Sequence, residues 1–206
     1  MNILEQISIE SFSQFKKGIL ICTIIFSTLY IEMHTKDNKP IMARQPDFVY
    51  NDSKEFLFAL KSCIDWLEKD KLVYQKVPHE ITMAQAVLES DYGRSRFATE
   101  GNNLFGIRTW DLNSPHLKPS NNPDSKFGVK VFKNKCDSVN DYMNLLNHGS
   151  AFEEFRELRF KMIKEGTIDP YILVEKLSRF ATDPNYVKLV KKTMKKLENE
   201  RISATD

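Results

Sequence analysis

The chain has 206 residues, with 30 basic against 28 acidic side chains and a formal net charge of +2. This length accommodates one domain with a sizeable core but not two large ones, and the charge lacks the basic excess of a dedicated nucleic-acid binder. The four histidines are scattered singly and the three cysteines show no CxxC spacing, so we expect no metal site and no cofactor.

The first predicted element is an apolar segment near the N-terminus. Residues 18–31 read GILICTIIFSTLYI, carry no charge and directly follow Lys16 and Lys17. This length suits a signal-peptide core and is short for a spanning helix unless flanking residues extend it. Because no small-x-small cleavage pattern follows, we predict that residues 1–34 form an uncleaved membrane anchor. A cleaved signal peptide and a buried core helix are the alternatives.

Residues 35–52 are predicted to be a linker, because they contain two prolines and little apolar periodicity. The folded domain is expected over residues 53–200. Its first helix is predicted from Ser53 to Lys71, where apolar side chains recur every three or four residues and Ser53 suits the N-cap position.

The rest of the pattern predicts a mainly α (α+β) domain. A second helix is expected from Pro78 to Tyr92, because proline suits a first turn and Gly93 suits a helix end. A loop-rich stretch over residues 93–126 leads to a strand over residues 127–132, half of a β-hairpin. Further helices are predicted over residues 138–147, 152–164, 170–179 and 184–200. The architecture is therefore a helical domain with a small loop and β-hairpin lobe inserted after the second helix.

A polar stripe runs along this second helix. Within ITMAQAVLES, residues 81–90, most side chains are apolar, but Thr82, Gln85 and Glu89 fall at i, i+3 and i+7 on one face. At the C-terminal turn, partial burial and the negative end of the helix dipole both raise the pKa of Glu89. A carboxyl group kept protonated near neutral pH suits a glycosidase, because it can protonate the leaving oxygen. A solvated surface glutamate is the alternative.

The segment that follows supports the catalytic interpretation. ESDYGRSRFATEGNNLFGI, residues 89–107, resembles the ESxWG, SxxA and NNLFG motifs of the Bax-type and flagellar- or autolysin-type endo-β-N-acetylglucosaminidases. The likeness covers residues 77 to about 196. It implies a lysozyme-like fold, hydrolysis of β-1,4 glycosidic bonds in bacterial peptidoglycan, and Glu89 as the general acid. It also implies that the glycan strand is the partner and that the domain lies on the periplasmic or extracytoplasmic side of the membrane. We expect a monomer and no nucleic acid.

The same motifs supply expected substrate-binding residues. Tyr92 stands where the family usually has tryptophan and keeps a face for stacking on a sugar. Asn102 and Asn103 offer amide groups to sugar hydroxyls and an N-acetyl group, with turn formation as the alternative role. Phe105 offers a further ring, for which we expect packing into the core more than stacking on a sugar.

A second motif lies near the C-terminus. TDPNY, residues 182–186, matches the family's TDPxY motif, so Tyr186 is expected to face the substrate. Asp183 belongs to the same motif, although an acidic residue before a proline also fits a helix start. Phe180 occupies a site often held by tyrosine, so a hydroxyl contact is lost there. Gln85 of the polar stripe completes the expected substrate-binding set.

The second carboxylate that a glycosidase commonly needs is missing from its usual place. The family places it just before the strand, where this chain has Gly128. Asp124 is the nearest upstream carboxylate and is predicted to be the second catalytic residue, with Asp111 as a more distant candidate. The substrate's own acetamido group is the third option.

Two other functions stay open. Muramidases and lytic transglycosylases also carry a glutamate at the end of a buried helix. A non-enzymatic alternative is an inactive, membrane-held scaffold that binds the cell wall.

The basic run KLVKKTMKK, residues 188–196, is interpreted as a solvated helix face. Cys63 and Cys136 are expected to be buried thiols, and a disulfide between them is open if the domain is exported.

Overall fold

The computed structural model describes residues 44–120 and 122–202. The predicted membrane anchor, residues 1–34, and most of the predicted linker lie outside the described residues. Among the helices that the structure describes, none combines the length and the apolar character that crossing a membrane requires. All the described helices and strands belong to one unit, Gln45–Asp206.

Helices make up most of this unit. The α-helices are α2 (Ser53–Glu68), α3 (His79–Ser90), α4 (Arg96–Gly101), α5 (Lys135–His148), α6 (Glu153–Glu165), α7 (Pro170–Leu173) and α8 (Tyr186–Ile202). The 3-10 helices are η1 (Val73–Gln75), η2 (Ser150–Phe152) and η3 (Val174–Phe180). The predicted helix over residues 170–179 is divided between α7 and η3, and α4 lies in the stretch predicted to be loop. The ends of the other predicted helices lie within three residues of the observed ones.

The folded unit begins earlier than predicted. The ring of Phe56 on α2 lies 5.7 Å from that of Phe48 and 5.2 Å from that of Tyr50, centroid to centroid. Residues from Gln45 onward therefore belong to the unit, because these two aromatic side chains pack against the core. The unit thus begins before the domain start predicted near Ser53.

The predicted N-cap of the first helix was wrong by one residue. Asp52 is the N-cap of α2, and its carboxylate accepts a hydrogen bond of 2.8 Å from the backbone N–H of Glu55. An aspartate side chain meets the free N–H groups of a helix start as well as the serine that follows it. Ser53 is instead the first residue inside the helix.

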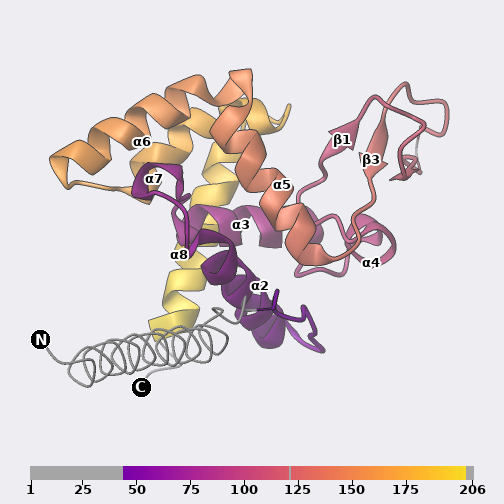
Figure 1. The fold of residues 1–206 in the computed structure, drawn as a ribbon, viewed down its shortest axis with the longest axis horizontal. Coiled ribbons are helices and arrows are strands. Elements are labelled where there is room, and N and C mark those ends of the chain that lie inside the picture. Colours follow the sequence, from indigo (N-terminus) through magenta and orange to yellow (C-terminus); the bar gives the residue numbers. More distant parts are fainter. Residues whose placement is uncertain (1–43, 121, 203–206) are drawn as a thin grey trace, which may run out of the picture. The chain divides into compact units, whose positions relative to one another are not determined.

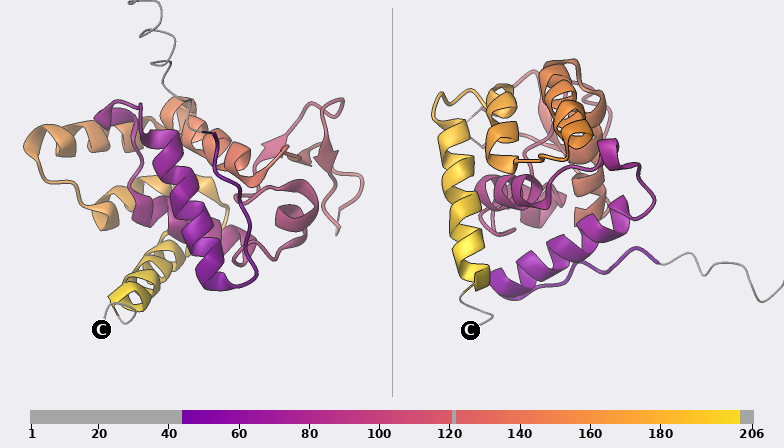
Figure 2. Two further views of the ribbon diagram at one scale, coloured as in Figure 1. Left: turned by 60° about the horizontal axis from the view of Figure 1, so that its bottom comes forward. Right: turned by 90° about the vertical axis from the view of Figure 1, so that its left-hand side faces the viewer.

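α3 lies at the centre of the unit, with α2 and α8 packed against it (Figures 1 and 2). Ile81, Ala84 and Ala86 are fully buried, as the nearly continuous apolar pattern of this helix predicted. The helix ends at Ser90, and the next residues, Asp91 and Tyr92, take left-handed backbone conformations with φ of 50° and 53°. This turn reverses the chain directly after the last helical turn, which carries Glu89.

A small lobe of strands stands to one side of the helices (Figure 1). Its strands are β1 (Arg108–Thr109), β2 (His116–Leu117) and β3 (Gly128–Lys130), which form an antiparallel sheet in the order β1-β3-β2. β3 is the predicted strand, and it is the central strand rather than half of a simple hairpin. β1 and β2 are two residues long, too short to show alternation in the sequence.

Cys63 of α2 and Cys136 of α5 form a disulfide, with their Cα atoms 5.7 Å apart. Both side chains are buried, so the expectation of buried cysteines is confirmed and the expectation of free thiols was wrong. The bond joins two helices that are far apart in sequence, and the sequence alone could not place their Cα atoms within bridging distance.

Candidate active site

Glu89 lies on the last turn of α3 with its side chain half-buried. Burial raises the pKa of its carboxyl group above the ordinary value, and a hydrogen bond from the Tyr186 hydroxyl acts in the opposite direction. The raised pKa agrees with the sequence-based prediction, and burial is its largest cause. The carboxyl group is thus placed to hold a proton at a higher pH than an exposed glutamate would.

The glycine of the NNLFG segment lies against this carboxyl group. Gly106 has a φ of +65°, and a Cβ built on it would lie 3.9 Å from Oε2 of Glu89. A residue with a side chain would be strained in this left-handed conformation and would add atoms beside the acid. Gly106 therefore lets the backbone approach Glu89 closely, which the motif alone did not reveal.

Asn103 builds the turn that presents Gly106. Its side-chain N–H groups donate to the carbonyls of Ile107 and Lys130, both at 3.0 Å. Its side-chain oxygen accepts from the backbone N–H groups of Phe105 and Ile107, at 3.2 and 3.1 Å. Because Asn103 is buried and both ends of its amide are engaged, it does not offer the predicted contact to a sugar in this arrangement.

Asn102 is also engaged within the protein. It ends α4 in a left-handed conformation, with φ of 52°. Its amide donates to the carbonyl of Phe132 at 3.0 Å and accepts from Lys135 at 3.2 Å. The turn-forming alternative for the two asparagines therefore describes the structure better than sugar binding does.

The two candidate phenylalanines pack against tyrosines. Phe105 is 2% exposed and stacks on Tyr142 of α5, with ring centroids 4.0 Å apart. The expectation that Phe105 fills the core is confirmed, and its buried ring does not reach a substrate. Phe180 is half-buried and stacks on Tyr186 at 5.8 Å. Both phenylalanines thus support tyrosine rings near Glu89.

The middle residue of the polar stripe, Gln85, is fully buried. Its side-chain N–H donates to the Tyr186 hydroxyl at 2.7 Å, and its side-chain oxygen accepts from the Tyr142 hydroxyl at 2.5 Å. The predicted contact between Gln85 and substrate is therefore not available, because the side chain is enclosed by the two tyrosines.

Tyr186 is the predicted site residue that the fold brings to Glu89. It is the first residue of α8 and is only 4% exposed, and its hydroxyl lies close enough to the Glu89 carboxyl group to lower the pKa of that group. Burial and the nearby Glu89 charge both raise the pKa of Tyr186, so the phenol keeps its proton. Asp183, by contrast, is exposed and accepts a hydrogen bond of 2.8 Å from the backbone N–H of Asn185. It stabilises the turn before α8.

Tyr92 lies three residues after Glu89 and is half-buried. Its ring is contacted by the guanidinium of Arg94 and the ammonium of Lys196, each 5.4 Å from the ring centroid. Lys196 also donates to the Tyr92 hydroxyl at 3.2 Å. The stacking face predicted for Tyr92 is therefore shared with two cations.

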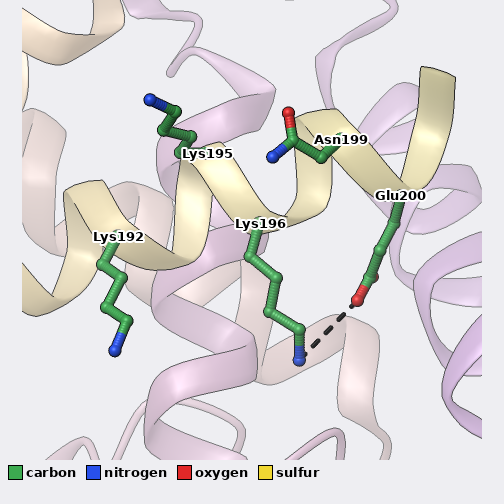
Figure 3. Close-up of a pocket in the computed structure, with 5 residues that line it drawn as sticks. All are labelled: Lys192, Lys195, Lys196, Asn199 and Glu200. Atoms are coloured by element: carbon green, nitrogen blue, oxygen red, sulfur yellow. Dashed lines mark ion pairs between the residues drawn. The ribbon is translucent and has the colours of Figure 1, made fainter. Parts of the chain in front are cut away.

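The basic run on α8 is exposed as predicted, with Lys192, Lys195 and Lys196 outside the core. These lysines line a cavity of about 420 Å³. Figure 3 shows them together with the ion pair between Lys196 and Glu200, whose charged atoms lie 3.6 Å apart. Glu89 does not line this cavity. We therefore define the candidate site by the contacts of Glu89 and not by the cavity.

The two candidate second carboxylates both lie exposed in the lobe. Asp111 accepts hydrogen bonds from the Ser114 hydroxyl at 2.5 Å and the Asn113 backbone N–H at 3.0 Å, and these contacts lower its pKa. Asp111 therefore stabilises its own loop. Asp124 lies in the loop between β2 and β3. It stays the predicted second catalytic residue.

The place of the missing carboxylate is filled by a histidine. Gly128 is buried in β3, and a Cβ built on it would lie 2.6 Å from Cβ and Cγ of His116 in β2. Such a distance is far shorter than a normal van der Waals contact. A side chain at position 128 would therefore displace His116.

Tyr142 is the residue near Glu89 that the sequence-based analysis missed. It is fully buried on α5, and Val139 and Leu146 occupy the same buried face at i−3 and i+4. This spacing predicts a buried tyrosine, and a buried tyrosine hydroxyl usually has a hydrogen-bond partner. The pattern was thus sufficient to predict a polar contact, but not to identify Gln85 as its partner.

With this geometry in view, the similarity to known proteins defines the class of protein. A family model described as mannosyl-glycoprotein endo-beta-N-acetylglucosaminidase matches residues 70–199. Glu89, Gly106, Tyr142 and Tyr186 all lie within the match. The chain therefore belongs to the glucosaminidase family of glycoside hydrolases.

Particular relatives share this domain. The chain is 28% identical over 138 residues to exo-glucosaminidase LytG of Bacillus subtilis, covering 62% of this chain and 48% of LytG. It is 23% identical over 168 residues to the peptidoglycan hydrolase FlgJ of Salmonella typhimurium, covering 75% and 50% of the two chains. It is 27% identical over 107 residues to protein bax of Escherichia coli, covering 52% and 37%. The chain thus spans half or less of the length of these relatives.

A solved structure shares the fold. The catalytic domain of the autolysin Auto from Listeria monocytogenes superposes with a TM-score of 0.52 at 20% identity, covering 80% of this chain and 93% of that domain. Together with the helical unit and its three-stranded lobe, this likeness confirms the predicted mainly α, lysozyme-like fold.

Proposed function

We propose that the chain hydrolyses the β-1,4 glycosidic bonds that follow N-acetylglucosamine in bacterial peptidoglycan, with Glu89 as general acid. The observation that carries this proposal is the setting of the Glu89 carboxyl group. It is half-buried at the end of α3 and lies beside Gly106 and near the Tyr186 hydroxyl. Membership of the glucosaminidase family and similarity to FlgJ, a peptidoglycan hydrolase, support the choice of substrate.

The chemistry follows from the two protonation states of Glu89. Because burial raises its pKa, the carboxyl group holds a proton that it donates to the glycosidic oxygen as the bond to the sugar breaks. Glu89 becomes a carboxylate in this step. The Tyr186 hydroxyl then donates its hydrogen bond to a full negative charge, so this contact is stronger after proton transfer than before it.

A second group must activate the water or attack the sugar carbon. We propose Asp124 for this role, because it is the carboxylate in the loop that enters β3. The substrate's acetamido group is the alternative, favoured by the absence of a carboxylate at Gly128 and the tight packing of His116 there.

We also propose that residues 1–34 anchor the chain in the membrane, with the catalytic unit on the extracytoplasmic side. The Cys63–Cys136 disulfide supports export, because disulfides persist mainly in oxidising compartments. Membrane fractionation tests the anchor. The full chain is expected in the membrane fraction and a chain lacking residues 1–43, which keeps the folded unit whole, in the soluble fraction, whereas a shortened soluble form of the full chain would identify a cleaved signal.

Product analysis tests the reaction. Purified peptidoglycan is digested with the full chain and the fragments are analysed by mass spectrometry, with the Glu89→Gln protein as the blank. The proposal predicts fragments with N-acetylglucosamine at the reducing end. Muramic acid at the reducing end would identify a muramidase, and the anhydro form a lytic transglycosylase. Binding without any cleavage would identify an inactive wall-binding protein.

A further inference from the structure

A second cavity, the α6 cavity, is formed by η1, the end of α5 and one face of α6. Figure 1 shows α5 and α6 side by side. The volume of the cavity is about 320 Å³, within the range of about 300 to 1,000 Å³ that small-molecule sites have. Among the described residues that line it, two are arginines, Arg156 and Arg159, and none is acidic. Neither Glu89 nor Tyr186 lines it, so the α6 cavity is separate from the candidate active site.

Arg159 is buried in the wall of the α6 cavity and is only 2% exposed. Its Nη1 donates to the Lys76 carbonyl at 3.2 Å, and its Nη2 donates to Oδ1 of Asn147 at 2.6 Å. The Nε–H group meets no acceptor among the described residues, and no described carboxylate forms an ion pair with Arg159. A buried charge is usually paired and fully hydrogen bonded. Arg159 is therefore a buried cation that lacks a counter-ion within the described part of the chain.

The surroundings of Arg159 disfavour its charge on balance. Burial and the nearby charge of Arg156 lower the pKa of Arg159 to about 10, and the charge of Glu68 acts in the opposite direction. Glu68 is itself engaged, because it accepts from the Val77 backbone N–H at 2.8 Å and lies 3.3 Å from Nε2 of His79. Arg159 still carries its charge at neutral pH. An anion in the α6 cavity would offset the repulsion between the two guanidinium groups.

Arg156 supplies free donors at the same cavity. Its Nη1 donates to the carbonyls of Leu146 and Gly149, at 3.2 and 2.7 Å, and so closes the C-terminal end of α5. Its Nε and Nη2 groups donate to no described residue. These two groups form one edge of the guanidinium, and such an edge binds both oxygens of a carboxylate through two parallel hydrogen bonds.

Two aromatic side chains give the α6 cavity an apolar part. Tyr74 of η1 is 44% exposed and Phe160 of α6 is 51% exposed, and both line the cavity. The ammonium of Lys164 lies 5.6 Å from the centroid of the Phe160 ring and adds positive charge nearby. An organic acid can place its carboxylate beside the arginines and its apolar body against these rings. Inorganic phosphate has no apolar body and would leave the rings unused.

We propose that the α6 cavity binds the carboxyl-terminal residue of a peptide, with Arg156 and Arg159 beside the carboxylate and Tyr74 and Phe160 against the side chain. The small volume admits one end of a chain rather than a sugar strand. That this end belongs to a peptide stem of peptidoglycan rests on the proposed function, whereas the recognition of a carboxylate by the cavity does not.

Binding of N-acetyl-para-fluorophenylalanine to the full chain tests the recognition of a carboxylate. This probe carries one carboxylate and one ring, and its fluorine NMR line broadens when it binds. The matched neutral probe is the corresponding amide, which keeps the ring and loses the charge. We expect saturable binding of the acid and at least about tenfold weaker binding of the amide, because hydrogen bonds to a charged group are lost. No saturable binding of the acid, or equal binding of the two probes, would overturn the inference.

Variants of the cavity wall locate the binding. Arg156→Gln should weaken binding of the acid at least about tenfold, because the free guanidinium edge is removed. Lys161→Gln removes the same charge from an exposed position of α6 outside the cavity and should bind the acid as the unmodified protein does. If Arg156→Gln does not fold, Asn147→Asp decides. The new carboxylate replaces the oxygen that already accepts from Arg159 and supplies the missing counter-ion, so the acid should again bind at least about tenfold more weakly. Unchanged binding in the folded variant, or an equal loss in Lys161→Gln, would contradict the inference.

Displacement of the probe identifies the source of the carboxylate. The Glu89→Gln protein is used, because Glu89 does not line the α6 cavity and the fragments should stay uncut. Soluble peptidoglycan fragments that keep their peptide stems should displace the acid. N-acetylglucosamine oligomers, which have no carboxylate, and inorganic phosphate should not, and displacement by either at the same concentration would refute a carboxylate site. Fragments that fail to displace the probe would exclude the stems as the source. Binding of the probe as expected in a chain that does not cleave peptidoglycan would refute the proposed function and leave the carboxylate site intact.

Discussion

The helices around Glu89 and the strand lobe hold their polar side chains in different ways. On the helical side, Gln85 and Tyr186 are buried and hydrogen bonded to each other and to their neighbours. In the lobe, Asp111 and Asp124 are exposed, and the bonds of Asp111 are made within its own loop. The proposed general acid, Glu89, is therefore positioned by the folded core, whereas a carboxylate from the lobe would have to reach the sugar from a surface loop. The predictions below test this division of roles.

The largest expected effect is that of Glu89→Gln. The amide keeps the volume of the side chain and hydrogen bonding to Tyr186 but has no proton to donate, so turnover should fall by more than about a hundredfold. The rate of release of reducing ends from peptidoglycan measures this, with thermal unfolding as the check on the fold. Glu80→Gln, at the exposed start of the same helix, is the matched control. Activity of the Glu89 variant within a few-fold of the original protein would remove Glu89 from the mechanism.

The next effect tests the lobe. If Asp124 is the base or nucleophile, Asp124→Asn should lower turnover by about a hundredfold or more. Asp111→Asn should change it by less than a few-fold, because Asp111 is bonded within its own loop. Each variant removes one negative charge from a loop of the lobe, Asp111 from the loop between β1 and β2 and Asp124 from the loop between β2 and β3, so their comparison is internally controlled. If both are nearly silent, the acetamido group takes the role, and a thiazoline-type inhibitor should bind tightly.

A smaller effect concerns pH. If Glu89 acts as general acid it must be protonated, so kcat/KM should fall as pH rises through its pKa, which burial places above the ordinary value. Tyr186→Phe removes the hydrogen bond that lowers this pKa, so the alkaline limb of the profile should move to higher pH, by about half to one unit. The maximal rate should fall as well, because the carboxylate formed on proton transfer loses its donor. A limb that stays in place or moves to lower pH would contradict the assignment of Tyr186 as donor to Glu89.

The sequence predicted the helical side well because burial leaves a periodic pattern. The position of Glu89 on a nearly apolar helix predicted its partial burial and its raised pKa, whereas the TDPNY resemblance predicted only that Tyr186 faces the substrate. It did not predict that Gln85 bonds two tyrosines, because residues 142 and 186 meet it only through tertiary packing. In the lobe, β1 and β2 are too short to show a pattern, and the fit between Gly128 and His116 depends on strand pairing that spacing does not encode.

The smallest expected effect on activity is that of Gly128→Ala, which tests why the lobe lacks its usual carboxylate. The new Cβ would lie 2.6 Å from Cβ and Cγ of His116, so the variant should lose about 1 to 3 kcal/mol of unfolding free energy, as overpacked sites do. Denaturant unfolding measures this loss. Because the contact involves the Cβ of His116, His116→Gly is the change that relieves it fully. The Gly128→Ala/His116→Gly double variant should therefore recover most of the lost unfolding free energy, apart from the cost of introducing a glycine at position 116. Turnover on peptidoglycan should stay within a few-fold of the original protein, since neither residue is assigned a chemical role. If the losses of unfolding free energy in the two single variants simply add in the double variant, Gly128 is required for another reason. The missing carboxylate would then need a different explanation from the packing of His116.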